Sequence, residues 1–146
     1  MTVVLHRPFP TSRMPQDPDS DHRLSGWARY HARHDALDAL LAAVDRGDRS
    51  PRLDAGDVEA MRPAFDSIED ALATLAWRWH NCLVARLDVA FDGSCATRRI
   101  DCGDVVRRLT VDRPALRAVL DANADSVAVR RVAAADRAVV AAAADL

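Results

Sequence analysis

The residues from Ser67 to Asp92, SIEDALATLAWRWHNCLVARLDVAFD, decide the fold of this chain. Wound as an α-helix, they form two neighbouring apolar stripes and one polar stripe. The apolar positions are Ile68, Leu72, Leu75, Trp79, Cys82, Leu83, Val89 and Ala90 in one stripe and Ala73, Trp77, His80, Val84, Leu87 and Phe91 in the other. A surface helix usually has one apolar face, so two stripes predict a helix that is covered on two sides. We therefore expect residues 67–92 to be the central helix of a bundle.

Helical spacing also marks the parts of the chain on either side. Residues 23–45 carry large side chains that alternate by three and four positions. These positions are Trp27, Tyr30, His34, Leu37, Leu41 and Val44. Three shorter helices are expected in the C-terminal third, after the capping residues Asp101, Asp112 and Ser126. The sequence thus predicts an all-α bundle in which two long antiparallel helices, about 23–45 and 67–92, are packed by three shorter C-terminal helices.

The N-terminal segment differs in composition from the rest of the chain. Residues 1–22 hold four of the seven prolines and show no helical period, which is typical of a flexible arm. Residues 23–146 are expected to form a single helical-bundle domain. No apolar run reaches the roughly 18 residues of a membrane span, and the apolar start is too short for a secretory signal. We expect a cytoplasmic protein without a membrane partner.

The charged residues are of unusual kinds. All 20 basic residues are arginine, and only two of the 22 acidic residues are glutamate. The net charge of −2 is too small for halophilic adaptation, so we attribute this usage to a GC-rich genome. Because the chain has no lysine, Schiff-base catalysis and a P-loop are excluded. The sequence also has no nucleophile elbow and no His-Glu-x-x-His, so it favours a protein that is not an enzyme.

Two histidines lie in the apolar stripes of the two long helices. Facing histidines inside a bundle can hold haem iron or part of a metal site. The candidate ligands are His31, His34, Asp35 and His80. The residues expected to line a pocket around them are Trp27, Tyr30, Trp77 and Trp79. The simpler interpretation is that His34 and His80 are hydrogen-bonded core residues, because the Glu-x-x-His pairs of di-iron bundles are missing. In that case we expect no cofactor.

The three cysteines are an odd number, which indicates reduced intracellular thiols. Cys102 lies at a predicted helix N-terminus, where the helix dipole favours the thiolate. Cys95 could then act as a resolving thiol, so a redox switch is one hypothesis and two inert small side chains are the other. A zinc site made of these two cysteines, Cys82 and His80 is disfavoured, because His80 and Cys82 point in different directions on one helix.

Nine arginines follow residue 97 and could form a surface that binds anions or nucleic acid. The candidates are Arg107, Arg108, Arg130 and Arg131. Two short helices followed by one capped at Ser126 have the order of a helix-turn-helix. However, seven aspartates offset these nine arginines, whereas nucleic-acid-binding domains usually have a larger basic excess. A solvated, salt-bridged face is the favoured interpretation, so a nucleic-acid partner is not expected.

The last predicted helix ends in an alanine-rich segment, residues 133–144, whose small side chains suit close packing on the central helix or on a second copy of the chain. The leading hypothesis is a non-enzymatic interaction or accessory protein that self-associates through the Ala/Val stripe of this helix. Its partner would be itself or another protein. The alternative is a bundle that binds a ligand, haem or a metal through His34 and His80, with or without catalysis there. The second alternative is a small DNA-binding regulator that uses the C-terminal arginines.

Overall fold

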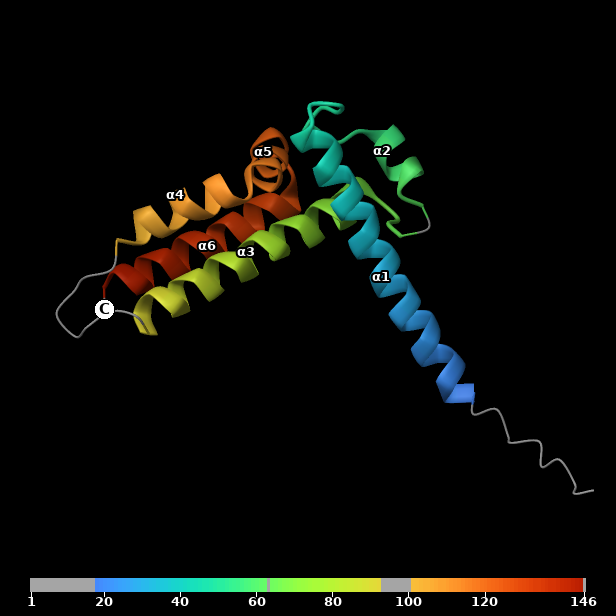
Figure 1. Cartoon of the computed structure of the whole chain (residues 1–146), viewed down its shortest axis with the longest axis horizontal. Helices are drawn as coiled ribbons and strands as arrows, with labels where there is room; N and C mark the ends of the chain where they lie inside the picture. The colour runs from blue at the N-terminus through green and yellow to red at the C-terminus, as the bar shows by residue number, and fades with distance from the viewer. Residues whose placement is uncertain (1–17, 63, 93–100, 146) are drawn as a thin grey trace, which may run out of the picture.

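The computed structural model of the chain describes residues 18–62, 64–92 and 101–145, which form six α-helices and no strand (Figure 1). In chain order these are α1 (Pro18–Asp45), α2 (Ala55–Ala60), α3 (Ile68–Asp92), α4 (Cys102–Asp112), α5 (Pro114–Ala122) and α6 (Val127–Ala144). The all-α class is therefore confirmed, and so are the two long helices and the three shorter C-terminal ones. None of these helices is long and apolar enough to cross a bilayer.

The ends of α1 show how local sequence sets a helix. It begins at Pro18 rather than at residue 23, and residues 1–17 lie outside the described part of the chain, so the flexible arm remains a prediction. At the other end, Gly47 takes a left-handed backbone with φ 74°. This conformation lets Gly47 N–H bond Val44 O at 3.0 Å, while the next N–H bonds Ala43 O at 3.0 Å. The two bonds form a Schellman motif, as glycine at this position predicts.

The central helix is α3. It packs along α6 and against α4, and α5 and α2 cover its first turns (Figure 1). Most of its first apolar stripe is covered, with Leu75 and Leu83 at 0% and 1% exposure, but Val89 near its end is 69% exposed. The second stripe is covered less completely, because Leu87 is buried while Trp77 is 50% exposed. The expected central role of residues 67–92 is thus confirmed, with the larger contact on the α6 side.

The expected antiparallel packing of the two long helices is wrong. Arg33 in the middle of α1 binds Asp70 in the first turn of α3, with Nη2 and Oδ1 2.7 Å apart. Asp38, later in α1, binds Arg78, later in α3, at 2.6 Å. Because the partners advance in the same direction along both helices, α1 crosses the start of α3 and does not lie antiparallel along it (Figure 1).

The second half of α1 packs on α5, and its first half projects away from the other helices (Figure 1). Leu37 and Leu40 in the second half are 1% and 3% exposed, whereas Trp27 in the first half is 63% exposed. The physical reason is that α4, α5 and α6 already occupy the side of α3 that α1 was expected to cover. Helical spacing shows which side chains can be buried together, but not which helix buries them.

A buried amide ties the connection between α1 and α2 to the C-terminal helices. The Asn123 side chain, 4% exposed, accepts a hydrogen bond from Leu53 N–H at 3.2 Å. Its Nδ2 donates to Pro51 O at 3.0 Å and to Val119 O at 2.7 Å. One side chain therefore satisfies three backbone groups of two segments that lie far apart in the sequence, and it fixes how α5 sits beside α1.

Candidate functional site

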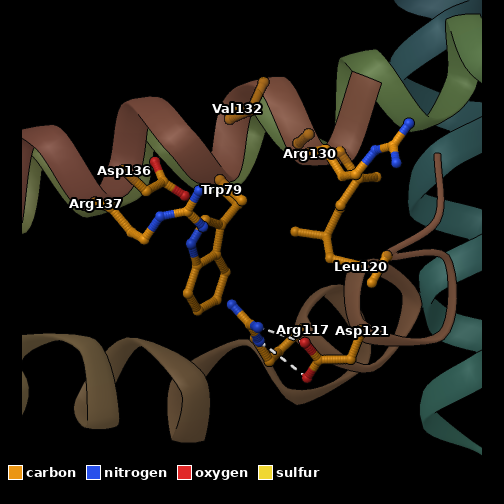
Figure 2. Close-up of a pocket in the computed structure, with 12 residues that line it drawn as sticks. Trp79, Arg117, Leu120, Asp121, Arg130, Val132, Asp136 and Arg137 are labelled. Atoms are coloured by element: carbon orange, nitrogen blue, oxygen red, sulfur yellow. Dashed lines mark hydrogen bonds and ion pairs between the residues drawn. The ribbon is translucent and has the colours of Figure 1, made fainter. Parts of the chain in front are cut away.

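A groove runs between α6 on one side and α4 and α5 on the other, with α3 beneath it (Figure 2). Its first section, between α6 and α5, has a volume of about 380 Å³. The apolar side chains of this section are Ala76, Trp79, Leu120, Ala124, Val129, Val132 and Ala133. Its charged side chains are Arg117, Asp121, Arg130, Asp136 and Arg137. Both the size and the mixture of an apolar lining with a few polar groups are typical of small-molecule sites.

The position of α6 beside this groove is set by its N-terminus. Ser126 caps the helix, as the sequence predicts, by accepting a hydrogen bond from Val129 N–H at 3.3 Å. Glu69 of α3 then accepts from Ser126 Oγ at 2.9 Å and from Ala128 N–H at 3.1 Å. A carboxylate at a helix N-terminus is favoured by the helix dipole. The start of α6 is therefore fixed on the start of α3, and the side chains of α6 that face the groove are fixed with it.

Trp79 is the central side chain of the groove. It comes from α3, is only 3% exposed, and its indole lies between the arginines of α5 and α6 (Figure 2). The Arg117 guanidinium is 5.2 Å from the centre of the Trp79 ring, a distance at which a cation is attracted to the face of an indole. Arg117 is also held by Asp121 one turn later, through Nε–Oδ2 at 3.0 Å and a second bond between Nη2 and Oδ1.

The second carboxylate of the groove, Asp136, is bonded to a histidine. His80 Nδ1 on α3 donates to Asp136 Oδ1 on α6 at 2.7 Å, and the two side chains are 14% and 16% exposed. Both carboxylates that line the groove therefore already have partners. By contrast, Arg130 and Arg137 form no ion pair within the described residues. The groove thus combines an apolar floor with cations that remain available to an anion.

The structure gives His34 and His80 different partners. His34 Nδ1 lies 3.4 Å from Tyr30 O within α1, whereas His80 is bonded across to α6. His31 and Asp35 are exposed on α1. Over the residues that the structure describes, no three His, Cys, Asp or Glu side chains are arranged to hold a metal ion. The four candidate ligands are consequently not brought together as the expected set, because α1 diverges from α3 where the two histidines were expected to face each other.

Of the four aromatic residues expected to line a pocket, only Trp79 lies in the groove. Trp27, Tyr30 and Trp77 are 63%, 51% and 50% exposed and do not line the groove. Trp27 and Tyr30 instead stack on each other on the surface of α1, with ring centres 5.8 Å apart. The reason is again the course of α1, whose first half has no neighbouring helix.

The structure describes one of the two cysteines of the redox hypothesis. Cys102 is the first residue of α4, as expected, but it is buried at 6% exposure and is not presented to solvent. Cys95 lies outside the described residues. The redox pair therefore remains a prediction.

Among the arginines, Arg107 and Arg108 both pair with Asp104, at 3.1 and 2.7 Å, which is the salt-bridged face that the composition favours. Arg130 lines the groove, while Arg131 is exposed outside it.

Sequence reasoning missed Asp121 and Asp136 as site residues, and it included Arg117 and Arg137 only among the nine arginines of a possible anion-binding surface. A signal for part of the site was present, because Arg130, Ala133 and Arg137 follow one another at helical spacing on one face of α6. That signal becomes a site only when α5 brings Arg117 opposite and α3 supplies Trp79. Comparisons of the chain with protein-family models, with curated proteins and with solved structures find no match.

Proposed function

We propose that this protein is a non-enzymatic binding protein and that its ligand is a small organic anion with an apolar body, held in the groove over Trp79. The observation that carries the proposal is which charged side chains of the groove already have a partner of opposite charge or a hydrogen-bond partner. Asp121 and Asp136 are already bonded to Arg117 and His80, while Arg137 projects over the groove without an acidic partner within the described residues. An anion would give Arg137 the partner that it lacks.

The apolar part of such a ligand is accommodated by the floor of the groove. Trp79 offers a flat indole, and Leu120 and Val132 close the section around it (Figure 2). Because these side chains are buried or nearly so, a charge placed at their edge is less screened than a charge in water. The apolar floor therefore strengthens the attraction between Arg137 and an anion, and the same floor favours an aromatic or aliphatic group on that anion.

The test is a titration with the dye anilinonaphthalene sulfonate, which joins an aromatic body to an anion and fluoresces when it leaves water. We expect saturable binding of one dye per chain, about tenfold weaker in Arg137→Gln, because a hydrogen bond to a charged group contributes roughly 1.5–3 kcal/mol and this side chain is exposed. Arg131→Gln is the matched control, because Arg131 is an exposed arginine of the same helix outside the groove. Equal loss in both variants, or equal affinity for the neutral anilinonaphthalene, would contradict the proposal.

A second candidate function is self-association, favoured by the exposed aromatic surface of α1. In the Ala/Val stripe of α6 that the sequence suggests for this role, Val132 is 3% exposed within the chain, whereas Ala142 is exposed. Leu37, Tyr30 and Trp27 follow one another at helical spacing along α1. Leu37 is buried by other helices, whereas Tyr30 and Trp27 are exposed. Exposed aromatic side chains in one patch mark interfaces, and a second copy of α1 offers the complementary seam.

Sedimentation velocity tests this candidate. We expect a dimer at micromolar concentration that becomes monomeric in Trp27→Ser with Tyr30→Ser. Val127→Ser is the matched control, because Val127 is 59% exposed on a different helix and its loss should leave the dimer intact. A wild-type chain that stays monomeric at about 100 µM, a concentration that detects a Kd weaker than the micromolar range, would remove this candidate.

A further inference from the structure

The groove does not end at Trp79. A second section, of about 450 Å³, continues between α6 and α4 toward the C-terminal end of α6. Five residues line both sections and therefore lie at their junction, namely Trp79, Arg117, Ala133, Asp136 and Arg137. The two sections are consequently parts of one elongated trough, with its charged groups at the junction and at the α5 end.

Beyond the junction the described lining is entirely apolar. Its side chains are Leu83, Val106, Val140, Ala141 and Ala144. From Arg137 at the junction to Ala144 the trough follows seven helical steps of α6, or about 10 Å at 1.5 Å per residue. A ligand that fills this part must therefore be long and apolar, and it must carry its charge at one end only.

The spacing of the two walls limits how thick that ligand can be. α4 and α6 approach each other to within 8 Å between Cα atoms, so they are close neighbours. A helix packed between them would need about 8–10 Å from axis to axis on each side. The space cannot take a partner helix without moving a wall, whereas an alkyl chain is thin enough to lie in it.

We propose that the ligand is a single-chain anionic amphiphile, with its head group at Arg137 and its alkyl chain along α6 past Ala141. This inference rests on the proposed function, because it assigns the anion to the same arginine, and it adds the chemical class of the apolar part. A fatty-acid carboxylate and an alkyl phosphate share this chemistry. The small side chains of Ala133, Ala141 and Ala144 keep the trough open for the chain.

The experiment measures the Kd of the saturated carboxylates from hexanoate to tetradecanoate by calorimetry, below their micelle concentrations, on the full chain. We expect the affinity to rise about twofold with each methylene, half the roughly fourfold that complete burial would give, because the trough is open to solvent on one side. The rise should stop once the chain extends past Ala144. Decanol should bind at least tenfold more weakly than decanoate. The Kd of decyl phosphate, compared with that of decanoate, shows whether the site prefers a phosphate or a carboxylate head group.

Ala141→Phe should block the far section and remove the dependence on chain length. Ala142→Phe is its control, because Ala142 is the next residue of the helix and is exposed outside the trough. Dye binding that depends on Arg137 together with a flat chain-length series would overturn this inference and leave the proposed function standing. Loss of both would overturn both, and decanol binding as tightly as decanoate would overturn the head-group assignment. The series of carboxylates measured on the wild-type chain tests the proposed alkyl site even if a variant fails to fold.

Discussion

Arg33 should be one of the most sensitive polar positions of the chain. Its Nη1 donates to Ala64 O at 3.2 Å and to Asp70 Oδ2 at 2.9 Å, and its Nη2 donates to Asp70 Oδ1 at 2.7 Å and to Thr74 Oγ1 at 3.0 Å. The guanidinium also lies 4.2 Å from the centre of the fully buried Phe65 ring. These contacts hold the middle of α1 to the start of α3.

The size of the effect follows from how far this pair is buried. Breaking a buried ion pair costs about 3–5 kcal/mol, whereas an exposed pair contributes roughly 0–1 kcal/mol. The side chains of Arg33 and Asp70 are 24% and 34% exposed, so we place the ion pair between these limits, at about 2 kcal/mol. The contact with Phe65 adds roughly 0.5 kcal/mol. Arg33→Gln should therefore lower the free energy of unfolding by about 2–3 kcal/mol, and Arg33→Lys by about half as much, because lysine keeps the charge but not the two parallel bonds.

The effect should depend on pH with a definite sign. The hydrogen bonds from Arg33 are the main reason that the pKa of Asp70 lies below its ordinary value, and the positive charge of Arg33 adds to them, while partial burial opposes them. A carboxyl whose pKa is lowered by folding stabilises the native state above its unfolded pKa of about 3.9, and this contribution is lost as the pH falls through the lower folded value. The difference between wild type and Arg33→Gln should thus be constant from about pH 5 to 8 and shrink below about pH 4.

Urea unfolding followed by far-ultraviolet circular dichroism at pH 7 and at pH 3 measures both quantities. Arg46→Gln is a suitable control, because its ion pair with Asp48 has both side chains more than 60% exposed and should matter little. A loss of less than 0.5 kcal/mol at pH 7, or a loss that is the same at pH 3, would refute the reasoning about Arg33 and Asp70.

Two further exchanges test the connections that position the helices. Asn123→Ala leaves the Leu53 N–H and the Pro51 carbonyl without their side-chain partner, whereas the Val119 carbonyl keeps its bond from the backbone N–H of residue 123. The exchange should therefore cost about 2–3 kcal/mol in urea unfolding, and a cost below 1 kcal/mol would contradict the role of this amide. Gly47→Ala places a Cβ at φ 74° and should cost about 1 kcal/mol, with Gly47→Asn costing less; equal melting temperatures for all three chains would show that the turn is not strained.

Much of the helical skeleton could be predicted because it depends on local sequence. The double stripe of residues 67–92 identified the central helix, and Ser126 marked the start of α6 by a capping rule that involves only near neighbours. What failed was the packing of α1. The alternation of Trp27, Tyr30 and Leu37 is one continuous pattern in the sequence, yet the structure buries Leu37 and exposes the two aromatic residues. Periodicity describes one helix, whereas burial depends on which other helix reaches it.

The candidate site was harder to predict for the same reason. Arg117 and Asp121 read as an ordinary ion pair one turn apart on a helix, and Arg137 as a solvated side chain. Their importance comes from Trp79, which is 38 or more residues away in the sequence and meets them only after α5 and α6 have folded onto α3. Conversely, His80 appeared important as a metal ligand, but in the structure it is the partner of Asp136. It thereby occupies one oxygen of a carboxylate that lines the groove.

The groove is better explained as a binding site than as imperfect packing. Protein interiors are close-packed, and apolar gaps are readily closed by larger side chains at little risk to the fold. Ala133, Ala141 and Ala144 are positions on α6 where a leucine would keep the helix and fill the gap, yet each carries a single methyl group. At the same junction Arg137 stands without an acidic partner among the described residues, although aspartates pair with so many of the chain's other arginines. The open apolar trough does not add to stability, and the exposed cation at its junction is not needed for it, but together they have the chemistry that an anionic amphiphile requires.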